Sequence, residues 1–376
     1  MRYKRFNSER NNKYLIVLVL AAIVATCFAY PYFYSALLKT DFNPNKLIRV
    51  SGIKDNNELR QEFAVFSGKL ASLQGTTLKL QSGDGNTLWQ EELDIQKPLL
   101  AVLEEIIVAA DTEKGIITGV DGKGKIVWES AAKGRLVRMG ADKGYIWAIT
   151  EYQRNTIVEI LNINGESTAY LQLGEAEALS VSLSPDGSYI ALSTAEVKDN
   201  RITGSIILYN DDSAIVWAKS YRDSLVMGVN ITDEGFVHVL TEEMLTCLSL
   251  TGGIRWQQDV NGYITKALLT DKGITAMTLS EDYRSGIPAQ KGQETVIYGK
   301  EGNKLGSLEH GQDIIGLVEG KDCIGIYSAR RLQLADYNGK IVTDKEFDRD
   351  FVRVYLLEDN FMAHISAGKI YFEPYL

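Results

Sequence analysis

The hydrophobic positions of this chain follow two different patterns, which meet near residue 39. Residues 14–38, YLIVLVLAAIVATCFAYPYFYSALL, contain no charged side chain and are apolar on every face of a helix. A helix needs about 20 such residues to cross a bilayer, so this run predicts one transmembrane helix from Tyr14 to Leu38. Beyond residue 39 the apolar residues come in short alternating or β-branched runs separated by Gly, Asn and Asp, which is typical of strands and hairpins.

The residues that flank the apolar run indicate its orientation. Residues 1–13 contain five basic side chains and one acidic one, whereas the whole chain has a net charge of −9. By the positive-inside rule, the basic tail 1–13 stays in the cytoplasm and the acidic remainder 39–376 lies outside. A cleaved signal peptide is the alternative, but its apolar core would be shorter and followed by a small-residue cleavage site. A lipoprotein would need a small residue before Cys27, where Thr26 stands.

One sequence unit recurs along residues 39–376: a strand, a tight polar turn, and a strand with tryptophan near its start. Its clearest copies span residues 78–93, 116–130, 206–220 and 246–260, and weaker copies span 160–173, 296–309 and 334–347. Trp89 and Trp128 are 39 residues apart, as are Trp217 and Trp256. A spacing near 40 residues with four strands per unit predicts an all-β fold, a β-propeller of four-stranded blades.

Seven such units fit between about residues 62 and 347, and three further strands follow at 351–359, 361–367 and 369–376. We expect a strand at 45–52 to complete this last blade, which would close a ring of about eight blades and remove an exposed sheet edge. Two of the spacings between successive repeat units are longer than the others, which predicts insertions at Val197–Gly204 and Tyr283–Glu294. Both fall between the second and third strands of a blade, so they should project from one face and form the first contact surface to test.

Tryptophan could stack on a sugar or a quinone, or it could fill the gap between neighbouring blades. Trp89, Trp128, Trp217 and Trp256 recur at one position of the repeat, so we expect a structural role in blade packing for all four. Trp147 is out of register with them, and we expect it in the core.

The segments DGNTLW, GKGKIVW and TGGIRW resemble the PQQ-like repeat. Some members of that superfamily are quinone-dependent alcohol dehydrogenases, and others are cofactor-free binding propellers such as the outer-membrane assembly lipoprotein of Gram-negative bacteria. The chain also resembles a family of bacterial membrane-anchored propellers of unknown function (DUF5711-like), over residues 45–376. SPDGSYIAL (184–192) resembles a blade of TolB or WD40 propellers. These resemblances imply a fold and leave the activity open.

Candidate chemistry is sparse in the sequence. Quinoproteins sandwich their cofactor against adjacent cysteines, but Cys247 and Cys323 are isolated, so we expect no cofactor. SGDGNTLW (82–89) resembles a sialidase Asp-box, which is itself a structural hairpin. His238, His310 and His364 should be too far apart on a ring to share a metal ion. The acidic balance argues against a nucleic-acid partner.

These observations predict a non-catalytic binding or scaffolding propeller. It would be held at the bacterial plasma membrane by residues 14–38 in the lipid bilayer and would contact an envelope protein or polymer. The absence of a disulfide framework fits a bacterial envelope protein. The alternative is an extracytoplasmic enzyme that acts on a glycoside or an alcohol.

Overall fold

The computed structural model of the chain describes residues 61–281, 283–284, 287–288 and 292–376, with the exception of residue 199. The predicted transmembrane helix 14–38 and the predicted closing strand 45–52 lie outside these residues. None of the helices in the described ranges combines the length and the apolarity needed to cross a membrane.

The described residues form eight sheets of three or four strands, which we number as blades 1 to 8 in chain order, and one separate two-stranded hairpin. Blades 1 to 4 comprise β1 (Gln61–Phe66), β2 (Lys69–Gln74), β3 (Thr77–Gln81), β4 (Thr87–Glu92); β5 (Pro98–Val102), β6 (Ile106–Asp111), β7 (Ile116–Asp121), β8 (Ile126–Ala131); β9 (Arg135–Asp142), β10 (Tyr145–Tyr152), β11 (Asn155–Leu161), β12 (Ser167–Gln172); β13 (Glu177–Leu183), β14 (Tyr189–Lys198), β15 (Arg201–Asn210) and β16 (Ile215–Arg222). Blades 5 to 8 comprise β17 (Val226–Ile231), β18 (Phe236–Thr241), β19 (Met244–Ser249), β20 (Ile254–Asp259); β21 (Tyr263–Leu269), β22 (Thr275–Ser280), β25 (Gln293–Tyr298), β26 (Lys304–His310); β27 (Gly316–Glu319), β28 (Cys323–Tyr327), β29 (Arg331–Asp336), β30 (Ile341–Glu346); and β31 (Arg353–Leu356), β32 (Phe361–Ser366) and β33 (Lys369–Pro374).

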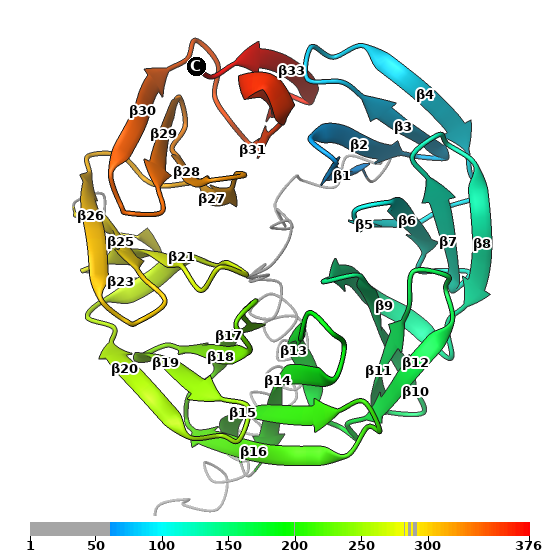
Figure 1. Cartoon of the computed structure of the whole chain (residues 1–376). Helices are drawn as coiled ribbons and strands as arrows, with labels where there is room; N and C mark the ends of the chain where they lie inside the picture. The colour runs from blue at the N-terminus through cyan, green and yellow to red at the C-terminus, as the bar shows by residue number, and fades with distance from the viewer. Residues whose placement is uncertain (1–60, 199, 282, 285–286, 289–291) are drawn as a thin grey trace, which may run out of the picture. The chain divides into compact units, whose positions relative to one another are not determined.

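The blades stand around a central axis, each with its first strand innermost and its last strand at the circumference (Figure 1). Neighbouring strands pair antiparallel in sequence order, as in β5 to β8. The middle strand β6 is buried at every position, whereas the outer strand β8 alternates between exposed and half-buried residues. This contrast follows from the ring, because inner strands have neighbours on both faces and outer strands meet water on one. The predicted all-β propeller of eight blades is therefore confirmed.

Eight hydrophobic clusters form the core, and each lies between two neighbouring blades. The cluster that closes the ring joins Phe63 and Leu70 of blade 1 to Tyr355, Leu357 and Ala363 of blade 8. The Glu358 N–H also donates to the Gly68 carbonyl at 2.8 Å. Blade 8 has three strands among the described residues. Its three-stranded sheet packs directly on blade 1, and the predicted pairing with residues 45–52 remains a prediction.

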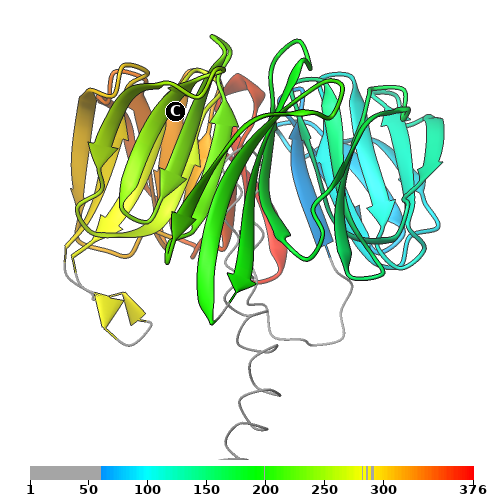
Figure 2. The ribbon, with the colours of Figure 1, turned by 90° about the horizontal axis from the view of Figure 1, so that it is seen from below.

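Two hairpin extensions leave the same face of the ring (Figure 2). In blade 4, β14 and β15 pair over ten residues each and end in the Lys198–Arg201 pair. In blade 6, the short hairpin of β23 (Tyr283–Arg284) and β24 (Ile287–Pro288) is inserted between β22 and β25. Both predicted insertions thus lie between second and third strands, as the sequence indicated. We call this side the hairpin face.

Candidate functional site

Four tryptophans occupy equivalent places in the outer strands of blades 1, 2, 4 and 5. Each pairs with the third-strand residue at the point where the register shifts by one residue; the pairs are Trp89 with Leu80, Trp128 with Gly119, Trp217 with Leu208 and Trp256 with Cys247. The three remaining complete blades place Ala169, Gly306 and Thr343 there. Trp147 lies instead in the second strand of blade 3 and is 8% exposed, in the core as expected.

Each of the four indoles reaches the next blade. The N–H groups of Trp89, Trp128, Trp217 and Trp256 donate to the carbonyls of Gly122, Ile163, Leu250 and Lys300 at 2.9, 2.8, 2.9 and 2.8 Å. Every acceptor is the second residue of the turn between the third and fourth strands of the following blade, which we call the outer turn. The fourth residue of that turn is glycine in all four cases, and a Cβ on Gly165 (φ +77°) would lie 2.5 Å from the Trp128 ring. The tryptophan and the outer turn therefore form one interlocked contact.

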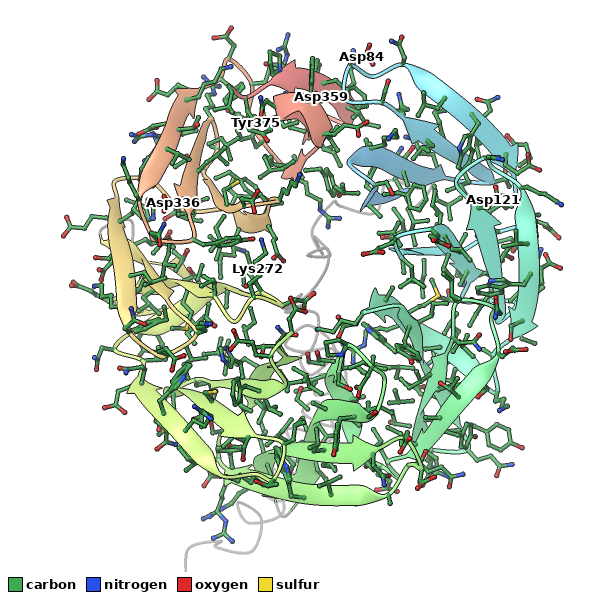
Figure 3. The ribbon with its side chains drawn as sticks, viewed as in Figure 1. Asp84, Asp121, Lys272, Asp336, Asp359 and Tyr375 are labelled. Atoms are coloured by element: carbon green, nitrogen blue, oxygen red, sulfur yellow. The ribbon has the colours of Figure 1, made fainter. Side chains whose placement is uncertain are left out.

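The side chain of the first residue shapes the outer turns of blades 2 and 7. The Asp121 carboxylate accepts the N–H groups of Lys123 and Lys125, both at 2.9 Å, and Asp336 repeats this with Asn338 and Lys340. Both aspartates are labelled in Figure 3. These backbone donors hold the pKa of both carboxyls below its usual range. Such side-chain-to-backbone bonds define the turn in the way that Asx turns do.

A buried polar network links blades 3 to 6 on the opposite side from the hairpin face. Lys143, 6% exposed, directs its ammonium at Asp271 (2.6 Å), Asp142 (3.2 Å) and the Asn230 amide oxygen (3.3 Å). Ser182 donates to the Asp142 carboxylate at 2.9 Å. Burial alone would favour the neutral amine, but the charges of Asp142 and Asp271 outweigh it and raise the pKa of Lys143. The cation thus joins blades 3, 5 and 6 directly, and Asp142 extends the network to blade 4 through Ser182.

The sequence motifs described above contain no residue of this network. Its signal is the recurrence of Asp-Lys-Gly in the first turns of two blades, at 142–144 and 271–273. The second copy behaves differently, because Lys272, labelled in Figure 3, is 48% exposed. Its ammonium contacts Asp322 at 3.2 Å and the Tyr337 ring at 4.6 Å.

The histidines do not come together. His238 and His364 are buried in the second strands of blades 5 and 8, and the His310 ring meets the Thr295 hydroxyl at 2.8 Å. Burial lowers the pKa of His238 to about 4. Within the described ranges, no three His, Cys, Asp or Glu residues are placed to hold a metal ion. The two described cysteines, Cys247 and Cys323, are both free thiols.

The segment that resembles an Asp-box uses its acidic residue locally. Asp84 accepts hydrogen bonds from the Ser82 hydroxyl and from the Asn86 side-chain amide, the latter at 2.6 Å. These bonds hold the pKa of Asp84 below its usual range. The carboxylate therefore serves its own turn, as in a structural Asp-box hairpin.

The hairpin face carries an exposed apolar pair. Val197 and Ile202 are opposite one another on β14 and β15 and are 37% and 38% exposed. Their side chains share one side of the extension, because directly opposed residues of an antiparallel pair point the same way. Most exposed apolar residues elsewhere on the ring, such as Ile215 and Ile254, start outer strands at the circumference. The tip of blade 4 thus presents apolar surface beyond the body of the disc.

No curated protein matches this chain. Among solved structures, BamB from Moraxella catarrhalis is 12% identical with a TM-score of 0.52, covering 86% of this chain and 98% of that one. Sqt1 of Saccharomyces cerevisiae is 9% identical with a TM-score of 0.55, covering 82% and 93%, and hydrazine synthase of Kuenenia stuttgartiensis is 8% identical with a TM-score of 0.50, covering 87% and 99%. At these identities the likeness concerns the propeller fold alone. A family model, "Family of unknown function (DUF5711)", matches residues 41–371. The chain therefore belongs to the DUF5711 family.

Proposed function

We propose that this protein is a non-catalytic binding propeller, anchored by residues 14–38 in the bacterial plasma membrane, which captures an envelope protein through its hairpin face. The observation that carries the proposal is the position of the two insertions, which both leave that face although they belong to blades 4 and 6. Loops and extensions held on a rigid scaffold are where binding residues concentrate. The apolar pair Val197 and Ile202 supplies surface that a partner can bury.

A photo-crosslinking residue at Ile202 of the full-length chain tests the contact in living cells. Ile215 is the matched control, because it belongs to the same blade, is 60% exposed and begins β16 near the opposite face. We expect a discrete crosslinked protein from position 202 and none from position 215. Equal crosslinking at both positions, or none at position 202, would contradict the proposal, and a crosslink to envelope polymer alone would change the partner class.

Replacement of the projecting parts of the two extensions, 197–202 and 283–292, by short turns tests the same idea independently. The replacement should keep Thr203 and Gly204, which pair with β16, and Gln293, whose side chain accepts the Ile314 N–H at 2.7 Å. We expect capture of the crosslinked protein to be lost while the urea unfolding midpoint stays within error of the parent chain. Unchanged capture would refute the role of the hairpin face.

The anchor has its own test. Added protease should digest residues 39–376 in intact spheroplasts and leave only a membrane-associated fragment that contains residues 1–38. Protection of the propeller until the membrane is lysed would contradict the proposed orientation without bearing on the hairpin face.

A further inference from the structure

The interface between blades 3 and 4 departs from the interlocked contact at two places at once. Ala169 occupies the tryptophan position of the outer strand of blade 3. Ser213, with φ +62°, occupies the glycine position in the outer turn of blade 4. The outer turn is otherwise kept, since the Ser213 N–H donates to the Asn210 carbonyl at 3.0 Å and the Asn210 side chain accepts the Ala214 N–H at 2.8 Å. The interface between blades 3 and 4 thus has the usual outer turn but no indole packed against it.

A cavity of about 180 Å³, partly open to solvent, lies at this place. Its walls include the apolar side chains of Ile160, Ala169, Leu183 and Ile190 and the half-buried ring of Tyr145. The turns that border it join first to second strands and third to fourth strands, so the cavity opens on the side opposite the hairpin face. The inference is therefore independent of the function proposed above.

The mouth of the cavity offers acceptors. Asp186 and Asp211 line it, and neither forms an ion pair with a described residue. Hydrogen bonds from the Ser184 and Ser188 hydroxyls lower the pKa of Asp186 to about 2, so this carboxylate is ionised at neutral pH. The Asp211 carbonyl, equivalent to the four carbonyls that accept indole N–H groups, accepts no hydrogen bond from the described residues.

The polar donors at the mouth are already used within the chain. The Tyr145 hydroxyl donates to the Asp186 carbonyl at 3.4 Å, the Ser188 hydroxyl to the Asp186 carboxylate at 2.8 Å and the Thr168 hydroxyl to the Ile160 carbonyl at 3.3 Å. An occupant must therefore bring donors, and a positive charge complements the two carboxylates.

The shape of the cavity restricts further which side chain can occupy it. A Cβ at the turn glycines would lie only 2.5 to 3.1 Å from the indole in the four interlocked contacts, so the Ser213 Cβ blocks an indole in that pose. An arginine side chain has a thin apolar stem for the aliphatic wall, a planar head of N–H donors, and an affinity for aromatic faces such as that of Tyr145. We propose that the cavity between blades 3 and 4 binds an arginine side chain of a protein partner.

The test uses the full-length chain and the peptide acetyl-Gly-Arg-Gly-amide, titrated by NMR or calorimetry. The same peptide with citrulline is the matched control, because citrulline keeps the shape and loses the charge. We expect at least tenfold weaker binding of the citrulline peptide, and at least tenfold weaker binding of the arginine peptide by Asp211→Asn. Since Asp186 also shapes its own turn, the Asp211 variant is the cleaner of the two carboxylate changes.

The variant Ala169→Trp with Ser213→Gly rebuilds the interlocked contact and fills the cavity, so it should abolish binding of the peptide while the chain stays folded. No binding by the parent chain, equal binding of both peptides, or full binding by the filled variant would each overturn the proposal. Stronger binding of acetyl-Gly-Trp-Gly-amide than of the arginine peptide would overturn the choice of occupant.

Discussion

The Trp128 indole N–H donates a 2.8 Å hydrogen bond to the Ile163 carbonyl, 35 residues further along the chain and in the next blade. The same geometry recurs from Trp89 to Gly122, from Trp217 to Leu250 and from Trp256 to Lys300. Each bond joins the outer strand of one blade to the outer turn of its neighbour. The repeat therefore encodes the contact between blades as well as the blades themselves.

This contact predicts a graded loss of stability at Trp128. Trp128→Phe removes the indole N–H and should lower the free energy of unfolding by about 1 kcal/mol. Trp128→Ala also removes the ring and should cost about 3 kcal/mol. The neighbouring Val127, 47% exposed, provides the control, because Val127→Ala should change stability by less than about 0.5 kcal/mol. Urea unfolding measures all three, and equal midpoints for the Phe and Ala variants would contradict the packing role of the ring.

The energetic coupling between the tryptophan and the turn glycine can be measured at the interface between blades 3 and 4, where Ala169 and Ser213 replace them. Ala169→Trp alone should not stabilise the chain, since the ring would meet the Ser213 Cβ. The double variant with Ser213→Gly should have a free energy of unfolding about 1–3 kcal/mol higher than that of Ala169→Trp alone, because the indole can then be buried. A double-mutant cycle gives the interaction energy directly. Additive effects of the two substitutions would show that the Ser213 side chain does not obstruct the ring.

The Lys143 network predicts a large difference between two lysines with the same local sequence. Lys143→Met leaves the buried Asp142 carboxylate without its cation and should cost about 3–5 kcal/mol. Lys272→Met, in the other Asp-Lys-Gly segment but 48% exposed, should cost less than about 1 kcal/mol. Thermal or urea unfolding of the two variants checks this. Similar losses would mean that Lys143 is not held as the structure describes.

His238 predicts a pH dependence with a definite sign. Its pKa is about 4 in the folded protein against 6.5 for the free side chain, so between these values only the unfolded chain takes up the proton. Stability should therefore fall as the pH falls from 6.5 to 4, by up to about 1.4 kcal/mol per pH unit from this residue.

His238→Phe is the matched variant, because it keeps a ring against Trp256, whose centroid lies 5.2 Å away, and cannot titrate. Its unfolding free energy should depend less on pH in this window. His310 and His364, whose pKa values burial also lowers, should leave a residual slope of the same sign. A variant profile as steep as that of the parent would exclude His238 as a main source.

The last strand should be needed for ring closure. Removal of residues after Gly368 deletes β33, which carries Phe372 against Gly85 of blade 1 and the Pro374 carbonyl that accepts Lys345 Nζ at 2.7 Å. We expect the truncated chain to lose cooperative unfolding in circular dichroism. A chain ending near residue 368 that still unfolds in one cooperative transition would refute this expectation.

The sequence by itself determined the strands, the blades and the contacts that recur between them. Alternation with a period of two and turn residues are local signals that recur in each repeat, and four of the repeats add a tryptophan at the same position. For this reason the third and fourth strands of blades 2 and 5 and the three C-terminal strands could be placed within a few residues. The positions of both insertions followed from the spacing of the repeats.

Only the tertiary structure decided which polar groups are buried and at which blade interface the tryptophan and the turn glycine are both replaced. Lys143 meets partners 87 and 128 residues away, and nothing near residue 143 distinguishes it from Lys272. Ala169 and Asp211 lie 42 residues apart, and they line one cavity only because the ring sets blade 3 against blade 4. Local sequence determines hydrogen bonding within a blade, whereas burial and charge compensation depend on side chains that only ring closure brings together.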